Sequence, residues 1–149
     1  MDNYEKNERY SELMEKLKKS IEEEFYYEAI FIVYAILEDR TESILRHANI
    51  DNINDAGRSM TLNEKLNIIN NNSKFKNDYI EGHLTRELIN KIHIWKNRRN
   101  ILIHDLINVK YNNEQIRHLA IEGYDLIKRI NNKSTLINKY NDKKFNDYK

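Results

Sequence analysis

The chain has 149 residues and a mass of 18.1 kDa, a size that fits one domain built around a single hydrophobic core. Its formal net charge of +1, with 33% charged residues, argues against a nucleic-acid binder that acts through bulk charge. The counts Cys 0, Gly 3 and Pro 0 exclude disulfides and thiolate metal sites, and they leave little turn chemistry for strands, so they predict an all-α fold.

The N-terminal residues, MDNYEKNERY, contain no apolar stretch like that of a secretory signal. The longest apolar run, Ala29 to Leu37, is about half of the ~20 residues that span a bilayer. We therefore expect a cytoplasmic protein that does not enter a membrane.

Two helices are predicted in the first third of the chain. Apolar residues recur every three or four positions from Tyr4 to Glu24, which indicates an amphipathic helix. The segment from Phe25 to Ala48 is apolar almost all round through Leu37 and then one-sided, which is typical of the central helix of a bundle. No Gly or Pro separates the two segments.

The next two helices follow a loop rich in Asn and Asp. Thr61 and Glu64 stand in the register of a capping box, so a short third helix is predicted to begin at Thr61. A fourth helical run extends from about Tyr79 to Val109.

A fifth helix is predicted to follow a cap at Asn112 or Asn113, and Gly123 weakens this helix without ending it. The pattern predicts an up-and-down bundle of four to five helices in a single domain over residues 1–138. Residues 139–149, rich in Asn and Lys, are expected to form a mobile C-terminal tail.

The fourth helix carries an arginine where its apolar stripe predicts a buried side chain. At about 100° per residue, Arg99 lies near the middle of an arc of apolar residues, while Asn100 and His104 lie on an opposite polar strip. Burying an unpaired guanidinium costs several kcal/mol, so Arg99 must reach water, a carboxylate or an anionic ligand. The apolar members of the arc are Leu88, Ile92, Trp95, Leu102 and Leu106.

Arg99 and His104 are separated by about 140° around a straight helix, so one face does not hold both. The long arginine side chain, a distorted helix, or a second copy of the helix across a two-fold axis could bring them together. We favour the two-fold arrangement, in which the apolar seam of one subunit meets the polar strip of the other.

The stretch RNILIH, from Arg99 to His104, resembles the signature of the HEPN superfamily. That signature is an Arg, a polar residue that is often Asn, a few apolar residues and a His, on a late helix of a helical bundle. The earlier segment AILEDRTESIL resembles the long helix that precedes the motif in abortive-infection-type members. The similarity extends over most of the chain, from about Phe25 to Leu126.

The resemblance implies a HEPN-like fold and a metal-independent endoribonuclease that acts as a homodimer, with two motifs lining one cleft. Arg99 and His104 would be catalytic, and Asn100 would support them. Arg98 also has a permitted spacing to His104, so it stays an alternative motif arginine. Leu106 stands where the toxin branch that pairs with a nucleotidyltransferase antitoxin usually has Tyr.

Further residues are candidates for supporting roles. Glu38 or Asp39 could pair with Arg99 and orient it, although a solvated helix end explains both residues as well. Arg98, Lys96 and Lys91 could contact RNA phosphates, or could form a solvated face.

No metal and no cofactor are expected. His47, His83, His93 and His118 form no pair at metal-ligand spacing with a nearby set of carboxylates, so surface or capping roles are expected for them.

The leading hypothesis is an endoribonuclease of bacterial defence or of a toxin-like stress response. Its expected partners are RNA, a second copy of the chain and an antitoxin or regulatory protein. The alternative is a non-catalytic helical dimer that binds RNA or a partner protein through the same cleft, with Arg99 as an anchor. Without the resemblance, an interhelical salt bridge and a solvated His would explain the same two residues.

Overall fold

The computed structural model describes residues 2–53, 56–71, 86–108 and 110–146, with the backbone alone from residue 134. Apart from one isolated β-bridge between Ile53 and Ser59, the described residues contain no strand, so the prediction of an all-α fold is confirmed. None of the described helices is both long and apolar enough to cross a membrane. The helices are α1 (Asn3–Glu22), α2 (Tyr26–His47), α3 (Leu62–Asn71), α5 (Arg86–Asp105) and α6 (Asn113–Asn146).

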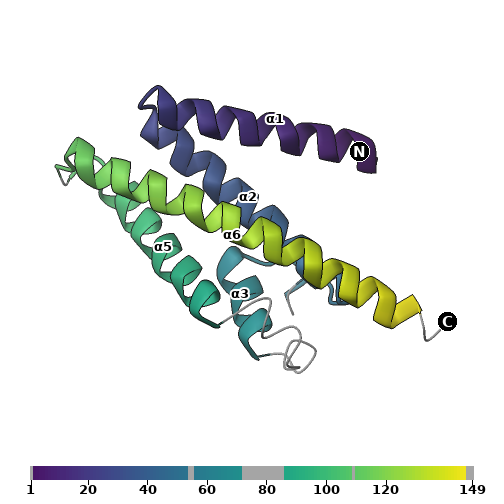
Figure 1. Cartoon of the computed structure of the whole chain (residues 1–149). Helices are drawn as coiled ribbons and strands as arrows, with labels where there is room; N and C mark the ends of the chain where they lie inside the picture. Colours follow the sequence, from purple (N-terminus) through teal and green to yellow (C-terminus); the bar gives the residue numbers. More distant parts are fainter. Residues whose placement is uncertain (1, 54–55, 72–85, 109, 147–149) are drawn as a thin grey trace.

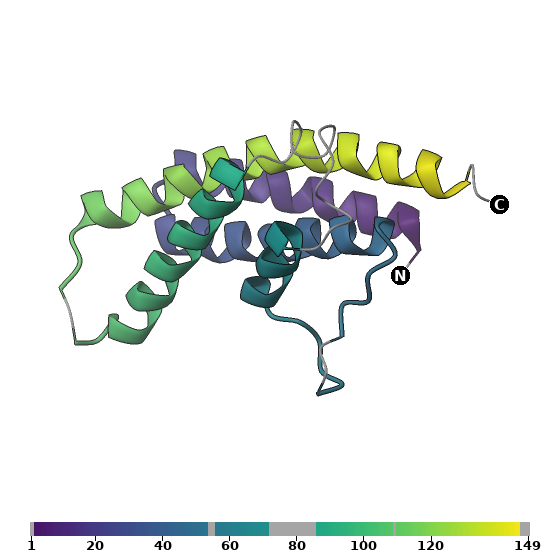
Figure 2. The ribbon, with the colours of Figure 1, turned by 90° about the horizontal axis from the view of Figure 1, so that it is seen from below.

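Helices α1, α2 and α6 run along the length of the molecule, and α6 packs against α2 over most of their shared length (Figure 1). Helix α5 contacts α6 and α3, and α3 in turn contacts α2. Seen from below, α5 crosses the long helices obliquely (Figure 2). The arrangement is therefore less regular than the up-and-down bundle that the sequence pattern predicts.

The first two helices are separated by a turn that uses neither Gly nor Pro. Glu24 takes a left-handed conformation with a φ of 63°, and the amide of Phe25 donates to the carbonyl of Ser20 at 2.8 Å. This is the hydrogen bond of a Schellman motif, which usually has glycine at the left-handed position. Helix α2 ends in the same way at Asn49, whose φ is 56°.

The capping box predicted at Thr61 and the helix cap predicted at Asn112 or Asn113 are both present. The amide of Glu64 donates to Thr61 Oγ1 at 3.2 Å, and the amide of Thr61 donates to the Glu64 carboxylate at 2.7 Å. At the start of α6 the cap is Asn112, whose side chain accepts from the amide of Gln115 at 2.9 Å. These bonds satisfy amides that a helix leaves free at its first turn.

The remaining predicted boundaries are met in part. Helix α5 covers the predicted fourth run between Arg86 and Asp105, and residues 79–85 lie outside the described part of the chain. Helix α6 continues beyond residue 138, where the predicted domain ends, to Asn146. Mobility of the tail stays a prediction.

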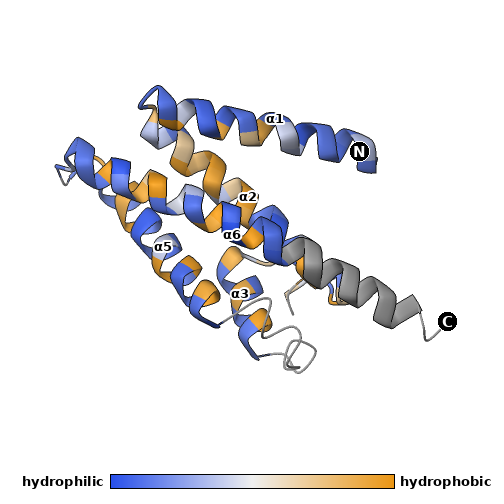
Figure 3. Ribbon diagram, in the orientation of Figure 1, coloured by the Kyte–Doolittle hydropathy of each residue, from blue (hydrophilic) through white to orange (hydrophobic). Residues whose placement is uncertain are grey.

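The core lies where α2, α5 and α6 meet, and the first half of α2 is its most apolar part (Figure 3). The indole of Trp95 is buried there, and its Nε1 donates to the carbonyl of Leu119 at 2.8 Å. A Cβ at Gly123 would lie 2.9 Å from Trp95 Cζ2 and 2.9 Å from Val33 Cγ1, so only glycine allows this close approach. This packing fixes the rotation of α5, and with it the direction in which each motif residue points.

Candidate functional site

The motif residues lie on one uninterrupted helix, α5. The predicted apolar stripe is buried at Leu88, Ile92, Trp95 and Leu102, and Arg99 is half-buried within it. Leu106, the last predicted member of the stripe, lies just past the end of α5 and is exposed.

The guanidinium of Arg99 lies on the ring of Tyr34 in α2. Arg99 Cζ is 4.0 Å from the ring centroid, which is within the range of a cation–π interaction. Arg99 Nη1 donates to Asn100 Oδ1 at 3.1 Å. The Nε atom is buried and has no hydrogen-bond partner among the described residues.

This environment is unusual for an arginine that only stabilises a fold. A buried donor without a partner costs about 1–3 kcal/mol, and buried arginines are normally paired with carboxylates. Within the described residues Arg99 has no carboxylate partner. The ring and one amide therefore hold a guanidinium that no carboxylate of the described residues neutralises.

The structure brings Arg99 and Asn100 together but does not bring His104 into contact with either. His104 is exposed and forms no hydrogen bond or ion pair with the described residues. Its position agrees with the helical period of about 100° per residue, which places Asn100 and His104 on one face and points Arg99 elsewhere. Joining Arg99 and His104 at one phosphodiester needs a further element, and a second copy of the chain is the one that the sequence suggests.

Neither predicted orienting acid forms an ion pair with Arg99. The Asp39 carboxylate is bound by Arg40 and by Lys6, whose Nζ lies 3.2 Å away, so its predicted role is corrected. Partial burial acts to raise the pKa of Asp39, but the hydrogen bond and charge of Arg40, together with Lys6, outweigh it and hold that pKa below its usual value. Asp39 thus ties α1 to α2.

Glu38 acts on Tyr34 instead. Burial of the phenol, followed by the Glu38 charge, raises the pKa of Tyr34, while the Arg99 charge opposes the shift. Tyr34 therefore feels two opposite charges, that of Glu38 on its own helix and that of Arg99 on α5.

The predicted RNA-binding cations already have partners within the fold. Lys91 Nζ lies 2.9 Å from the Glu87 carboxylate, and Arg98 pairs with Glu122 of α6. Lys96 is only 5% exposed and donates to Asn63 of α3, so its predicted phosphate contact is corrected. The α3–α5 packing buries Lys96, and this burial lowers its pKa.

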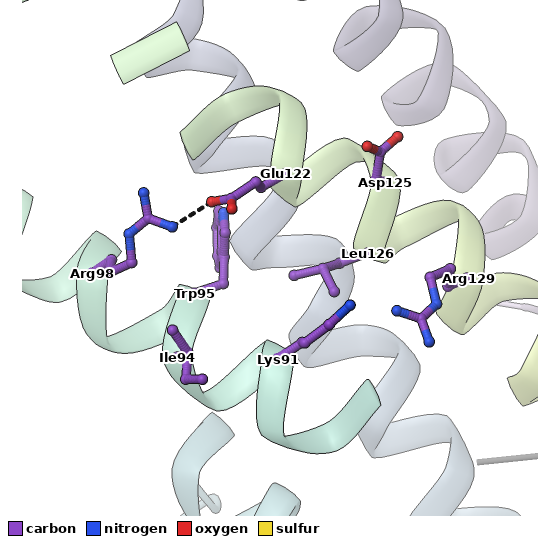
Figure 4. Close-up of a pocket in the computed structure, with 8 residues that line it drawn as sticks. All are labelled: Lys91, Ile94, Trp95, Arg98, Glu122, Asp125, Leu126 and Arg129. Atoms are coloured by element: carbon purple, nitrogen blue, oxygen red, sulfur yellow. Dashed lines mark hydrogen bonds and ion pairs between the residues drawn. The ribbon is translucent and has the colours of Figure 1, made fainter. Parts of the chain in front are cut away.

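Two neighbouring hollows line the contact between α5 and α6, with volumes of about 250 and 330 Å³. Arg98 lines both, and the first has Trp95 and Leu126 between charged rims (Figure 4). The cations Lys91, Arg98 and Arg129 face the acids Glu87, Glu122 and Asp125 in this region. The two hollows together, which we call the α5–α6 groove, are therefore charge-balanced and offer little attraction to a phosphate backbone.

A third hollow, of about 170 Å³, lies beside Arg99 between α2 and α5. We call its exposed apolar rim the α2–α5 apolar surface, and it consists of Tyr27, Phe31, Ile103 and Leu106. Phe31 is 69% exposed. Large apolar side chains gathered in this way are typical of a surface that another molecule covers.

The described residues contain no group of three or more His, Cys, Asp or Glu that could hold a metal ion. His93 is half-buried, and its burial, with the charge of Lys96, lowers its pKa. His83 lies outside the described residues.

Comparison of the chain with models of known protein families, with curated proteins and with solved structures gave no match. The resemblance to the HEPN superfamily therefore stays a prediction from the motif residues and their helical setting.

The sequence-based predictions do not single out Tyr34 and miss its contact with Arg99. A tyrosine inside the apolar run AIFIVYAIL, four residues before Glu38, is the signal that could have marked it, because Tyr34 and Glu38 share one face of α2.

Proposed function

We propose that the protein is a metal-independent endoribonuclease. The observation that carries the proposal is the state of Arg99, a half-buried guanidinium that rests on an aromatic ring with no carboxylate partner among the described residues. A permanent, unneutralised charge held in a fixed place is suited to a phosphate, which arginine binds through two donors. Asn100 and His104 are the other two polar residues of the HEPN-like motif.

In this reaction the 2′-hydroxyl of RNA attacks the adjacent phosphorus and expels the 5′-oxygen of the next nucleotide. The products are a 2′,3′-cyclic phosphate and a 5′-hydroxyl, with no net redox change and no added water. His104 accepts the proton of the 2′-hydroxyl or gives a proton to the leaving oxygen. Arg99 stabilises the negative charge on the phosphorane oxygens, and Asn100 supports Arg99 through their hydrogen bond.

We further propose that the active form is a homodimer. The α2–α5 apolar surface borders Arg99, so a second copy that covers it would also exclude water from the guanidinium. In such a dimer, His104 of one subunit can lie beside Arg99 of the other. Defence or a toxin-like stress response, with an antitoxin or regulatory protein as partner, is the proposed setting.

The test is to incubate the purified protein with end-labelled single-stranded RNA in EDTA and to map the termini. We expect 2′,3′-cyclic phosphate ends, and a loss of about 10²–10³-fold in rate for Arg99→Ala and for His104→Ala. Helical circular dichroism and the mass in solution should stay unchanged. Cleavage that persists without His104, or that requires Mg²⁺, contradicts the mechanism.

Arg98→Ala is the matched comparison, since it removes the adjacent guanidinium from the α6 side of the same helix. We expect a much smaller loss of rate than for Arg99→Ala. A larger loss at Arg98 would identify it as the motif arginine and move the site to the α5–α6 groove. A dimer that binds RNA without cutting it would favour the non-catalytic alternative.

A further inference from the structure

We infer that Tyr34 is a positioning residue that holds the Arg99 guanidinium in place without neutralising its charge. This inference assigns a role to a residue of α2, outside the motif. Its effect on cleavage rests on the proposed function, whereas the contact itself can be tested without it.

The geometry of the contact supports the inference. Arg99 Cζ lies 4.0 Å from the centroid of the Tyr34 ring, and both side chains are half-buried. A cation over an aromatic face is attracted by the ring electrons, and partial removal of water strengthens this attraction. The only hydrogen bond that Arg99 donates to the described residues goes to its own neighbour, Asn100. Among the described residues, the ring is therefore the contact from another helix that fixes the guanidinium.

An arginine of α2, Arg40, provides a comparison. Arg40 lies over the ring of Tyr10, with its Cζ 4.5 Å from the centroid, but it is also bound twice by the Asp39 carboxylate. An ion pair of that kind neutralises the guanidinium and occupies donors that a phosphate would need. Arg99 has the ring but no carboxylate partner among the described residues, so it is held in place while its charge remains available.

The aromatic face, and not the hydroxyl, carries this role. Tyr34 Oη forms no hydrogen bond with the described residues. Burial and the Glu38 charge raise the pKa of the Tyr34 phenol, so the ring is neutral at neutral pH. Phenylalanine at this position keeps the aromatic face, whereas leucine keeps most of the side-chain volume but has no aromatic face.

The experiment compares Tyr34→Phe with Tyr34→Leu on the full chain, with kcat and KM for single-stranded RNA measured in EDTA. We expect Tyr34→Phe to stay within about 3-fold of the wild type, because the cation–π contact is retained. Tyr34→Leu should lower kcat by about 10-fold or more with a smaller change in KM, because a mobile guanidinium stabilises the transition state less well. Equal kcat for Tyr34→Leu and the wild type overturns the inference.

Tyr10→Leu is the matched control, because it removes the ring beneath Arg40 while the Asp39 ion pair remains. It is expected to lower the melting temperature without lowering kcat. If both leucine variants lose kcat in proportion to their loss of stability, Tyr34 has only a structural role and the inference is wrong.

A spectroscopic measurement separates this inference from the proposed function. In a protein labelled with ¹³C-arginine, the side-chain resonances of Arg99, assigned with Arg99→Lys, should be shifted by the ring current of Tyr34. The shift should persist in Tyr34→Phe and disappear in Tyr34→Leu. If the wild type does not cut RNA, the proposed function fails while this shift still tests the contact. Absence of the shift in the wild type overturns the inference in either case.

Discussion

Helix α5 contacts α6 on one side and α2 on another, and the polar groups at the two contacts are satisfied to different degrees. On the α6 side, Trp95 Nε1 donates to the carbonyl of Leu119, and Arg98 pairs with Glu122. On the α2 side, Arg99 rests on the ring of Tyr34, and its buried Nε has no partner among the described residues.

The difference separates a contact that stabilises the fold from one that keeps a charge available. Buried polar groups in stable folds are nearly always hydrogen-bonded, so an exception needs an explanation. At Arg99 the missing partner coincides with an exposed apolar rim, as expected where a ligand or a second subunit completes the surroundings. Two adjacent arginines on one helix thus have different surroundings because they point about 100° apart.

The largest effect on stability is expected from Trp95→Ala, on the α6 side. Removing a buried indole leaves a cavity and lowers the free energy of unfolding by about 3–5 kcal/mol. Tyr34→Leu, on the α2 side, should cost about 1 kcal/mol because that ring is only half-buried. Urea unfolding followed by circular dichroism measures both. Equal losses for the two variants would remove the distinction between the contacts.

Gly123→Ala should destabilise the protein, although alanine is the better helix former. The gain in helix propensity is about 1 kcal/mol, while the added Cβ would overlap Trp95 and Val33 at 2.9 Å and cost about 1–3 kcal/mol. We expect a net loss of about 1 kcal/mol in thermal unfolding. Val33→Ala in the same chain should remove part of the penalty, and a double-mutant cycle measures that part. A stabilising Gly123→Ala would show that this contact is loosely packed.

Lys96→Met sharpens the comparison, because Lys96 is another cation of α5 without a carboxylate partner among the described residues. Burial lowers the pKa of Lys96 in the folded state, so between that pKa and the higher unfolded value the unfolded chain binds more protons. Stability should therefore rise with pH through that alkaline window, and the rise should be absent in Lys96→Met.

At neutral pH the same variant should be neutral or more stable by about 1 kcal/mol, because it removes the cost of burying a charge. The pH series is measured by urea unfolding, with Lys91→Met as a control at an exposed position of the same helix. A destabilised Lys96→Met would mean that the bond to Asn63 outweighs the burial of the ammonium.

The helices could be predicted from the sequence because their signals are local. The capping boxes at Thr61 and Asn112 each join residues three positions apart, and the apolar period of α5 is read within a few turns. The break between α1 and α2 was not marked by any breaker, since Glu24 adopts a left-handed conformation that its residue type does not suggest.

The candidate site could be predicted only in part, for a different reason. The helical period of α5 predicts Arg99 in the buried stripe and His104 on a polar strip, and both predictions need only the sequence of that helix. The partner of Arg99 depends on how α2 packs against α5, which no local pattern encodes. For that reason Tyr34 was missed, and Asp39 and Lys96 were given roles that their actual neighbours exclude.

The smallest effect is expected from the Arg98–Glu122 pair, which is also the most direct way to break the comparison. Both side chains are about half exposed, and a surface ion pair contributes about 0.2–1 kcal/mol, less at high salt. A double-mutant cycle with Arg98→Ala and Glu122→Ala should therefore give a coupling energy in that range, with stability measured at low and high salt. A coupling energy well above it that salt does not screen would mean that the α6 side also holds a charge away from water. Arg98 would then share the property that singles out Arg99, and the assignment of the site to the α2 side would lose its physical basis.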